Sequence, residues 1–416
     1  MSNKAVHLAS EIVLVNVSGE DQPGLMAMLT STLARYQVRV LDVGQAVIHD
    51  ELNVGLLVQV IDRNDTADVM KDLQFETRDF GITVRFTPIS EADYQDWVAS
   101  QGKRRYIVTL LAAGFTGEQL AEVTGTVHRF GLNIDSIRRL SGRVPLERSD
   151  GHTRTSIEMS LRGEVADPGA LKGALLAAAD RLDFDFSVQE DTVYRRNRRL
   201  VAFDMDSTLI DAEVIDELAR LHGVFDQVAA ITERAMRGEL QFQDSFRARA
   251  ALLKGLPETA LREVADAVKL NDGAHRLIRA LKMFGYKTAI LSGGFQYVGD
   301  HLRDTLGIDY VHANRLVVRD GLMTGEVDGP IVDAARKAEL LLEIARREGI
   351  SRQQTIAIGD GANDLPMLSA AGLGIAYHAK PVVKESASHA ISNFGLDSVL
   401  YLLGFSDRDI ETVLAE

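Results

Sequence analysis

Residues 201–208 read VAFDMDST, a short apolar run that ends in two aspartates. The apolar residues predict a buried strand, and Asp204 and Asp206 stand where that strand ends. Either side chain could point into a site, depending on how the backbone bends. Acids spaced in this way also cap or solvate turns, and a pattern as short as D-x-D-x-T arises by chance. The residues further along the chain are therefore needed to choose between a structural and a catalytic role.

The chain after this run alternates short apolar strands with helices. Strands are predicted within TAILSGG (288–294), TIAIGDGAND (355–364) and LGIAY (373–377). Such alternation predicts an α/β domain with a Rossmann-like parallel sheet, whose functional site lies at the carboxyl ends of the strands. We expect this domain to span residues 193–416.

Three further elements follow the paired aspartates in a fixed order. Ser292 comes after the strand TAIL, Lys337 lies in the helical segment ARKAELLLEI, and Asp360 and Asp364 belong to GDGAND. Taken alone, Ser292 would be a turn serine and Lys337 an exposed helix lysine. Taken together, the four elements resemble the signature motifs of the haloacid dehalogenase superfamily.

This resemblance implies a phosphomonoesterase that works through an aspartyl-phosphate. Asp204 would attack phosphorus, and Asp206 would protonate the departing alkoxide and later deprotonate the hydrolytic water. Ser292 and Lys337 would bind the oxygens of the transferring phosphoryl group.

The same resemblance implies a magnesium ion. A phosphate monoester carries nearly two negative charges, so an anionic nucleophile reaches phosphorus only if a cation screens the repulsion. The carboxylates of Asp204 and Asp360 and the backbone carbonyl of Asp206 would form a hard oxygen site for Mg²⁺. Asp364 would orient the groups of that site.

Residues 207–291 separate the first two motifs, far more than one strand-to-helix crossover requires, and predict an inserted helical cap at about 211–275. Within it, EVIDELAR (213–220) and AMRGELQFQDSFRARAALLKGLP (235–257) resemble the phosphoserine phosphatase family, a likeness that covers roughly residues 200–377. The substrate implied is O-phospho-L-serine, and the reaction is the last step of serine biosynthesis. The residues implied to bind it, besides Ser292 and Lys337, are Glu213 for the ammonium, Arg249 for the carboxylate, Met236 and Phe242 for the apolar wall, and Gly293 and Asn363 near the phosphate.

Without the family likeness these cap residues have ordinary interpretations. Glu213 and Arg249 would be solvated charges, and Met236 and Phe242 would be helix-core residues. Two other functions stay open: a phosphatase for another small phosphomonoester or a phosphoprotein, and an amino-acid sensor with a non-catalytic phosphatase-like domain.

The order of elements βαββαβ occurs twice before residue 193. The two copies predict ferredoxin-like α+β domains at 1–98 and 99–192, and they resemble ACT domains. The first copy has the turn Asp21-Gln22-Pro23-Gly24, where backbone N–H groups at a helix start could hold a carboxylate. The second has AGFTG at 113–117 instead, although its GLNI, with Asn133, is family-like.

ACT domains commonly bind amino acids and pair edge to edge. The resemblance therefore implies a possible effector site at Asp21, Gly24 and Asn133, with L-serine as the natural candidate, and a homodimer. The alternative is that the repeats serve only dimerisation or folding.

Composition excludes several classes of partner. With 46% hydrophobic and 25% charged residues, no cysteine and a net charge of −14, we expect a globular protein with no disulfides, no membrane span and no nucleic-acid partner. The start MSNKAVHLASE lacks a secretory signal, so we expect a cytoplasmic location. The basic run RRNRR at 195–199 is interpreted as a solvated linker or domain rim.

Overall fold

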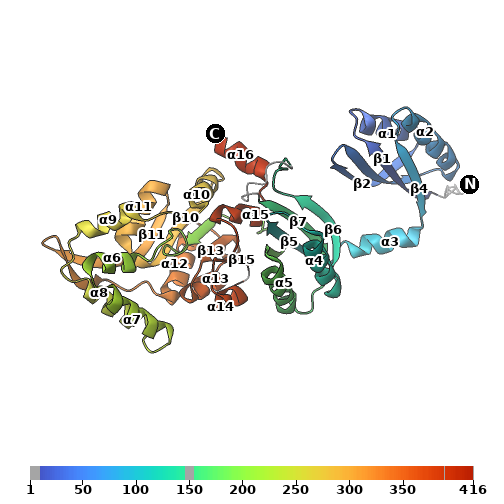
Figure 1. Cartoon of the computed structure of the whole chain (residues 1–416). Coiled ribbons are helices and arrows are strands. Elements are labelled where there is room, and N and C mark those ends of the chain that lie inside the picture. The colour runs from blue at the N-terminus through green and yellow to red at the C-terminus, as the bar shows by residue number, and fades with distance from the viewer. Residues whose placement is uncertain (1–9, 146–153, 388, 416) are drawn as a thin grey trace, which may run out of the picture. The chain divides into compact units, whose positions relative to one another are not determined.

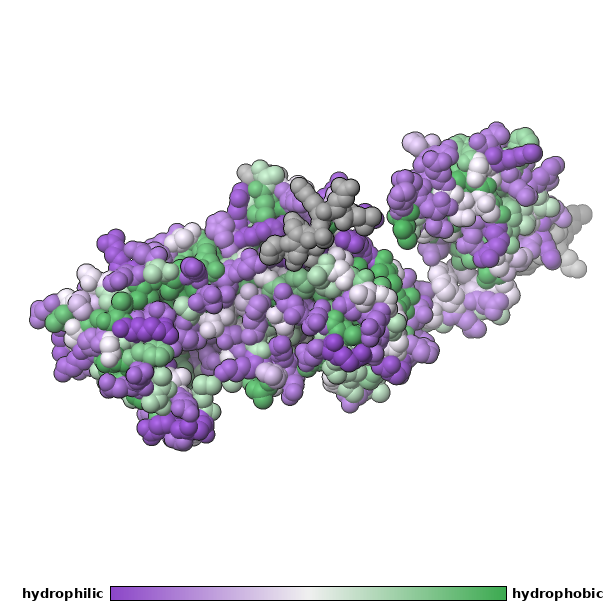
Figure 2. Space-filling view, viewed as in Figure 1, coloured by the Kyte–Doolittle hydropathy of each residue, from purple (hydrophilic) through white to green (hydrophobic). Residues whose placement is uncertain are grey.

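The computed structural model describes residues 10–145, 154–387 and 389–415, in two compact units, Met1–Lys103 and Arg104–Glu416 (Figure 1). The start of the chain, on which the expectation of a cytoplasmic location rests, lies outside the described residues. Among the residues that are described, no helix has the length and apolar character needed to cross a membrane. Figure 2 shows one face, on which hydrophilic residues predominate and apolar residues lie in small groups.

The first unit is a four-stranded antiparallel sheet with helices on one face. Its order in space is β2-β3-β1-β4. Val13, Val15 and Val17 alternate along β1 and pack against Leu29 and Leu73 of the helices, the period-2 pattern of a half-buried strand. The elements are β1 (Glu11–Glu20), α1 (Leu25–Leu33), β2 (Val38–Ile48), β3 (Glu51–Val60), η1 (Arg63–Asp65), α2 (Thr66–Arg78), β4 (Thr83–Ile89) and the following helix α3 (Glu91–Ser100).

The second repeat has the same topology, β8-β5-β7-β6, so the predicted pair of βαββαβ folds is confirmed. Helix α5 begins at Pro168 because the Asp167 side chain accepts a hydrogen bond from Ala170 N at 3.0 Å and Pro168 occupies the first turn. The elements are β5 (Arg105–Ala112), α4 (Gly117–Arg129), β6 (Asn133–Arg139), β7 (Thr155–Arg162), α5 (Pro168–Leu182) and β8 (Asp185–Glu190).

The rest of the second unit is a Rossmann-like sheet, as predicted. Parallel strands lie in the order β11-β10-β9-β13-β14-β15, and β12 pairs antiparallel with β11. The strands are β9 (Leu200–Phe203), β10 (Lys287–Phe295), β11 (Tyr310–Arg319), β12 (Leu322–Asp328), β13 (Thr355–Gly359), β14 (Leu373–Tyr377) and β15 (His389–Ile391).

Helices cover both faces of this sheet. Val201 and Phe203 pack with α10 and α11, whereas Leu200 and Ala202 pack with α12 and α13. Strand β9 is thus buried on both sides, which explains its continuous apolar run. The remaining elements are α10 (Ala274–Met283), α11 (Gln296–Leu306), α12 (Ala334–Arg347), η2 (Arg352–Gln354), η3 (Ala362–Asp364), α13 (Leu365–Ala370), α14 (Pro381–Ser386), η4 (Leu396–Ser398), α15 (Val399–Leu402) and α16 (Asp407–Ala415).

Four helices are inserted between β9 and α10. They are α6 (Val214–His222), α7 (Phe225–Met236), α8 (Phe242–Leu252) and α9 (Thr259–Ala267). The two chain segments that join this cap to the sheet are tied together. Ile210 bridges Leu270, and Asp211 N donates to Lys269 O at 2.9 Å.

The sheet does not end at β15. Ala390 of β15 pairs antiparallel with Phe186 of β8, so the second repeat and the Rossmann-like part share one sheet. The carboxylate of Asp185 accepts hydrogen bonds from the backbone N–H groups of Ser392 and Asn393, both at 2.9 Å. These bonds fix the connection just beyond β15.

The interpretation of residues 195–199 as solvated is wrong for two of the arginines. Arg195 and Arg198 are only 5% and 7% exposed. Arg195 is ion-paired with Glu158 of β7, and Arg198 donates to Gln353 O at 2.6 Å. These two arginines are buried because Arg195 packs against the second repeat and Arg198 against the Rossmann-like part.

Candidate active site

Three neighbouring strands place the predicted motifs at one edge of the sheet. Asp204 follows β9, Asp360 follows β13, and Ser292 lies within β10, which continues to Phe295 rather than ending after Leu291. Chain order reverses at β9, whose neighbours are β10 and β13. Open α/β sheets bind ligands at such a switch point.

A cavity of about 630 Å³ lies between this edge and the cap. Nine predicted residues line it: Asp204, Asp206, Glu213, Met236, Phe242, Arg249, Gly293, Asp360 and Asn363. Ser292, Lys337 and Asp364 do not line it and are fully or almost fully buried. The sheet and the cap therefore contribute to one chamber, with a buried group of polar residues among the strands.

The turn after β9 brings both aspartates to the cavity. Asp204 N donates to Ile358 O at 2.9 Å, which continues the pairing with β13, and the backbone then turns through Ser207 with φ of +55°. Asp206 Oδ1 accepts from Val214 N at 3.1 Å. Burial, followed by the nearby charges of Glu213 and Asp204, raises the pKa of Asp206 well above its ordinary value.

Lys337 is buried between two carboxylates. Its Nζ lies 2.9 Å from Asp204 Oδ1 and 2.7 Å from Asp364 Oδ1. Burial alone would lower the pKa of Lys337, but the two carboxylates outweigh burial and raise it. The interpretation of Lys337 as an exposed helix lysine is therefore excluded.

Three carboxylates gather where a metal was predicted. One oxygen from each of Asp204, Asp360 and Asp364 lies within 4.8 Å of the others. Burial, followed by the charge of Asp204, raises the pKa of Asp360 and raises that of Asp364 to about 7. Hard oxygen ligands crowded in this way suit a divalent cation, which would offset their repulsion.

Asp364 differs from the other two in its partners. Its Oδ1 accepts from Lys337 and its Oδ2 from Gly361 N at 3.0 Å. Asp360 instead accepts from Thr208 Oγ1 at 2.9 Å. Both oxygens of Asp364 already have donors, so it fits an orienting role better than direct ligation.

The glycines after Ser292 allow two close approaches. A Cβ at Gly293 would lie 2.9 Å from Cζ of Phe242, and one at Gly294 would lie 2.3 Å from Oδ2 of Asp206. Ser292 Oγ accepts from Gly294 N at 2.8 Å. Sequence reasoning missed Gly294, although the doubled glycine in SGG was a visible signal of a tight approach.

On the cap side, Glu213 and Arg249 have few partners. Ser207 Oγ donates to Glu213 Oε1 at 2.9 Å. Burial by the surrounding residues, more than the neighbouring carboxylates, raises the pKa of Glu213, although the residue still reaches solvent. Arg249 makes only long hydrogen bonds, at 3.4 Å, to Ser245 O and Thr232 Oγ1. Within the described ranges, no acidic oxygen lies at ion-pair distance from its guanidinium. Arg249 is therefore available to a carboxylate.

The two apolar cap residues differ in exposure. Phe242 is half-buried and stacks on Phe246 with ring centroids 6.1 Å apart. Met236 is 67% exposed, so the alternative of an ordinary helix-core residue is wrong for it.

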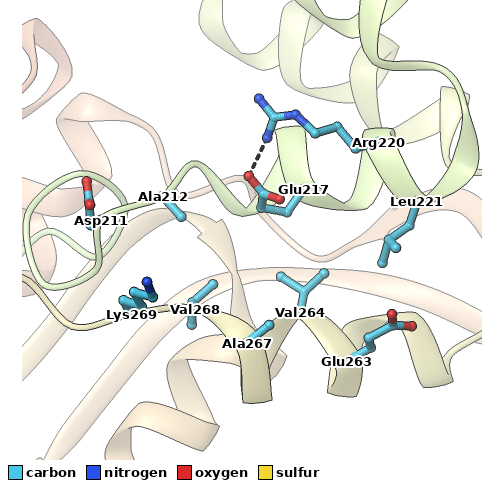
Figure 3. A pocket seen from close by; sticks show the side chains of 10 residues that line it. All are labelled: Asp211, Ala212, Glu217, Arg220, Leu221, Glu263, Val264, Ala267, Val268 and Lys269. Atoms are coloured by element: carbon cyan, nitrogen blue, oxygen red, sulfur yellow. Dashed lines mark hydrogen bonds and ion pairs between the residues drawn. The ribbon is translucent and has the colours of Figure 1, made fainter.

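A second cavity, of about 410 Å³, lies beside the two segments that join the cap to the sheet (Figure 3). Asp211 and Ala212 belong to one segment, and Val268 and Lys269 to the other. Figure 3 also shows the ion pair between Glu217 and Arg220 at its rim. None of the predicted site residues lines this cavity.

The possible effector residues Asp21, Gly24 and Asn133 lie far in the sequence from the residues of the active-site cavity. Gly24 caps α1 with φ of +94°, and Asp21 N donates to Asp50 O at 2.8 Å, both within the first unit. Asn133 is exposed at the start of β6, and its Nδ2 donates to Asp135 Oδ1 at 3.0 Å. Their role stays a prediction.

The fold and the arrangement around Asp204 define a hydrolase of the haloacid dehalogenase type. The family model for haloacid dehalogenase-like hydrolases matches residues 198–372, and the model for the ACT domain matches residues 11–87.

Curated relatives give a finer assignment. A phosphoserine phosphatase from Streptomyces coelicolor is 40% identical over 96% of this chain and 93% of its own length. A phosphoserine phosphatase from Mycobacterium tuberculosis is 38% identical over 96% of this chain and 94% of its own length. A crystal structure of a probable phosphoserine phosphatase from Vibrio cholerae has a TM-score of 0.57 and 34% identity, covering 75% of this chain and 88% of that one. The chain belongs to the phosphoserine phosphatase family.

Proposed function

We propose that the protein hydrolyses O-phospho-L-serine to L-serine and phosphate, the last step of serine biosynthesis. The observation that carries this proposal is the cavity in which Glu213 and the unpaired Arg249 of the cap are joined with Asp204 and Asp206 of the sheet edge. A zwitterionic leaving group needs an acid for its ammonium and a forked donor for its carboxylate. Met236 and Phe242 supply the apolar wall beside them.

The reaction would proceed in two displacements. A carboxylate oxygen of Asp204 forms a bond to phosphorus while the bond from phosphorus to the serine oxygen breaks, and Asp206 gives its proton to that oxygen. Asp206 then takes a proton from water, which attacks the phospho-aspartate, so that phosphate leaves and Asp204 is restored. The raised pKa of Asp206 supports its role as the initial proton donor.

We propose Mg²⁺ as the cofactor. The carboxylates of Asp204 and Asp360, with the backbone carbonyl of Asp206, would hold it. The bound ion would screen the negative charge between the nucleophile and the phosphate. Asp364 would keep Lys337 and the loop at Gly361 in place around these ligands.

The phosphate oxygens need donors as well as a cation. Lys337 and the hydroxyl of Ser292 would stabilise the charge that develops on the transferring group. Gly293 and Asn363 line the same cavity and would donate to, or orient, the phosphate. We further propose that the ACT-like repeats bind an amino acid, with L-serine as the first candidate, and that the protein is a homodimer.

The first test is phosphate release from O-phospho-L-serine with Mg²⁺, comparing the wild type with Asp204→Asn. The substitution should lower the rate by at least about 10³-fold, since the amide cannot form the covalent bond. Comparable rates would overturn the nucleophile assignment. Wild-type activity on other phosphate esters but not on phosphoserine would leave the mechanism standing and overturn the substrate.

A further inference from the structure

Acidic side chains outnumber basic ones among the residues that line the active-site cavity. Its lining carboxylates are those of Asp204, Asp206, Glu213, Asp216 and Asp360, and its lining cations are Arg249 and Lys380. A phosphate monoester that enters this cavity approaches more acids than bases. A cation near the entrance would lower the electrostatic cost of entry.

The other positive charges near the cavity already have a partner or a proposed one. Lys337 is buried and paired with two carboxylates, and Arg249 is proposed to bind the carboxylate of the substrate. Lys380 is exposed, and its ammonium makes no ion pair or hydrogen bond with any residue of the described ranges. Lys380 is thus the lining cation with no other assignment.

Lys380 also lies at the edge of the sheet formed by the carboxyl ends of the parallel strands. It follows β14, which neighbours β13 on the side away from β9, so it stands near the carboxyl end of the strand next to that of Asp360. Val382 and Val383 of the same segment line the cavity with it, and Val382 is 62% exposed. Lys380 therefore lines the cavity on the side of the sheet, the side from which the phosphoryl chemistry is proposed to proceed.

We propose that Lys380 is a specificity-determining residue that attracts the phosphate dianion of the incoming substrate and guides it past the lining carboxylates to Asp204. This inference rests on the proposed phosphatase function and deepens it, because it assigns recognition of the phosphate before the chemical step. Lys380 acts on binding and entry, and takes no part in bond making. Its contribution is electrostatic and is therefore screened by salt.

The experiment compares Lys380→Ala and Lys380→Glu with Lys384→Ala. Lys384 lies one turn beyond Lys380, within α14 and outside the cavity, so the control removes the same charge from the same segment. At low ionic strength kcat/KM for phosphoserine should fall about 10-fold in Lys380→Ala and further in Lys380→Glu, mainly through KM. The differences should shrink as salt is raised to about 0.5 M. Lys384→Ala should match the wild type.

Two results would overturn the inference: equal kcat/KM in Lys380→Ala and Lys384→Ala, or a fall in kcat with KM unchanged. Calorimetric titration with inorganic phosphate tests the same point without turnover, and Lys380→Glu should bind it more weakly than Lys384→Ala does. If the wild type ignores phosphoserine, the proposed substrate fails, yet the phosphate titration still supports or overturns the role of Lys380. Thermal unfolding of each variant identifies any that fails to fold.

Discussion

Lys337 Nζ lies 2.9 Å from Asp204 Oδ1, and both side chains are buried. The proposed nucleophile is therefore ion-paired before any substrate is present. The lysine shares its charge with Asp364, at 2.7 Å, so one ammonium organises the carboxylates that follow two neighbouring strands.

Replacing Lys337 by alanine should affect both stability and catalysis. Removing one partner of a buried ion pair costs about 3–5 kcal/mol, because the carboxylates lose their cation, and loss of a charge-stabilising donor costs about 10²–10³-fold in kcat. Urea unfolding and phosphate release measure the two effects. Arg336→Ala removes a neighbouring charge whose partners are on the surface, and it should cost less than about 1 kcal/mol. Equal costs for the two variants would contradict the pairing.

Arg249→Ala should weaken recognition of the leaving group. We expect kcat/KM for phosphoserine to fall about 10- to 100-fold, the value of hydrogen bonds between charged groups. Hydrolysis of phosphoethanolamine, which lacks the carboxylate, should change little. Arg247→Ala, on the same helix but outside the cavity, is the matched control. A uniform loss on both esters would assign Arg249 to the fold of the cap.

We expect the ion pairs of Asp397 to make a pH-dependent contribution to the stability of the fold. It is 4% exposed and ion-paired with Arg154 of the second repeat and with Arg276 at 2.9 Å. Burial alone would raise the pKa of Asp397, but the two arginines outweigh burial and lower it. A carboxyl with a lowered folded-state pKa stabilises the fold above its unfolded pKa of about 3.9, and this stabilisation is lost as pH falls through the folded-state value.

Asp397→Asn should accordingly lower the stability of the second unit by about 3 kcal/mol near pH 7, and by progressively less as the pH falls below about 3.9. Calorimetric Tm values across this range measure the difference. Asp304→Asn, at a side chain 73% exposed, should have little effect at either pH. A constant difference between wild type and Asp397→Asn at all pH values would contradict the assignment.

Strand β2 is where we predict that two copies pair. It is an edge strand, and Val40, Val43, Val47 and Ile48 are 48%, 54%, 38% and 71% exposed. A lysine on a sheet edge opposes pairing, so Val43→Lys should convert a dimer to a monomer in light scattering. Phe75→Lys places the same charge at an exposed apolar residue of α2 and should leave the dimer intact. A monomeric wild type would show the prediction to be wrong.

The possible effector site predicts a response of activity to L-serine. Deleting residues 1–103, which form one compact unit, should abolish the part of the response that depends on Asp21 and Gly24. Asp21→Ala and Asn133→Ala, assayed for phosphate release with and without L-serine, show which repeat is responsible. If L-serine does not alter the wild type, dimerisation or folding becomes the favoured role of the repeats.

Much of the fold followed from local patterns. The order of elements predicted the two βαββαβ repeats, and strand β9 followed from its apolar run. Nine of the residues predicted from the resemblance to known motifs line one cavity in the structure, although their roles in the reaction stay predictions.

Features that depend on tertiary partners were not predicted. Arg195 and Arg198 are buried because Glu158 and the carbonyl of Gln353 accept their hydrogen bonds, and these partners lie far away in sequence. Strand β15 spans only His389–Ile391, too short for a periodic signal, so the shared sheet had no local indication. The proposed role of Lys380 likewise depends on the acids that line the same cavity, which lie far from it in sequence.

The pairing of β8 with β15 also covers the backbone edge of the last parallel strand. A terminal strand of a parallel sheet presents unpaired N–H and C=O groups that can recruit a strand from another molecule. Here β8 occupies that position, and the repeat that it belongs to continues the sheet through β5, β7 and β6. A fragment that began at residue 193 would expose β15, and it would be expected to aggregate even if its catalytic residues were intact.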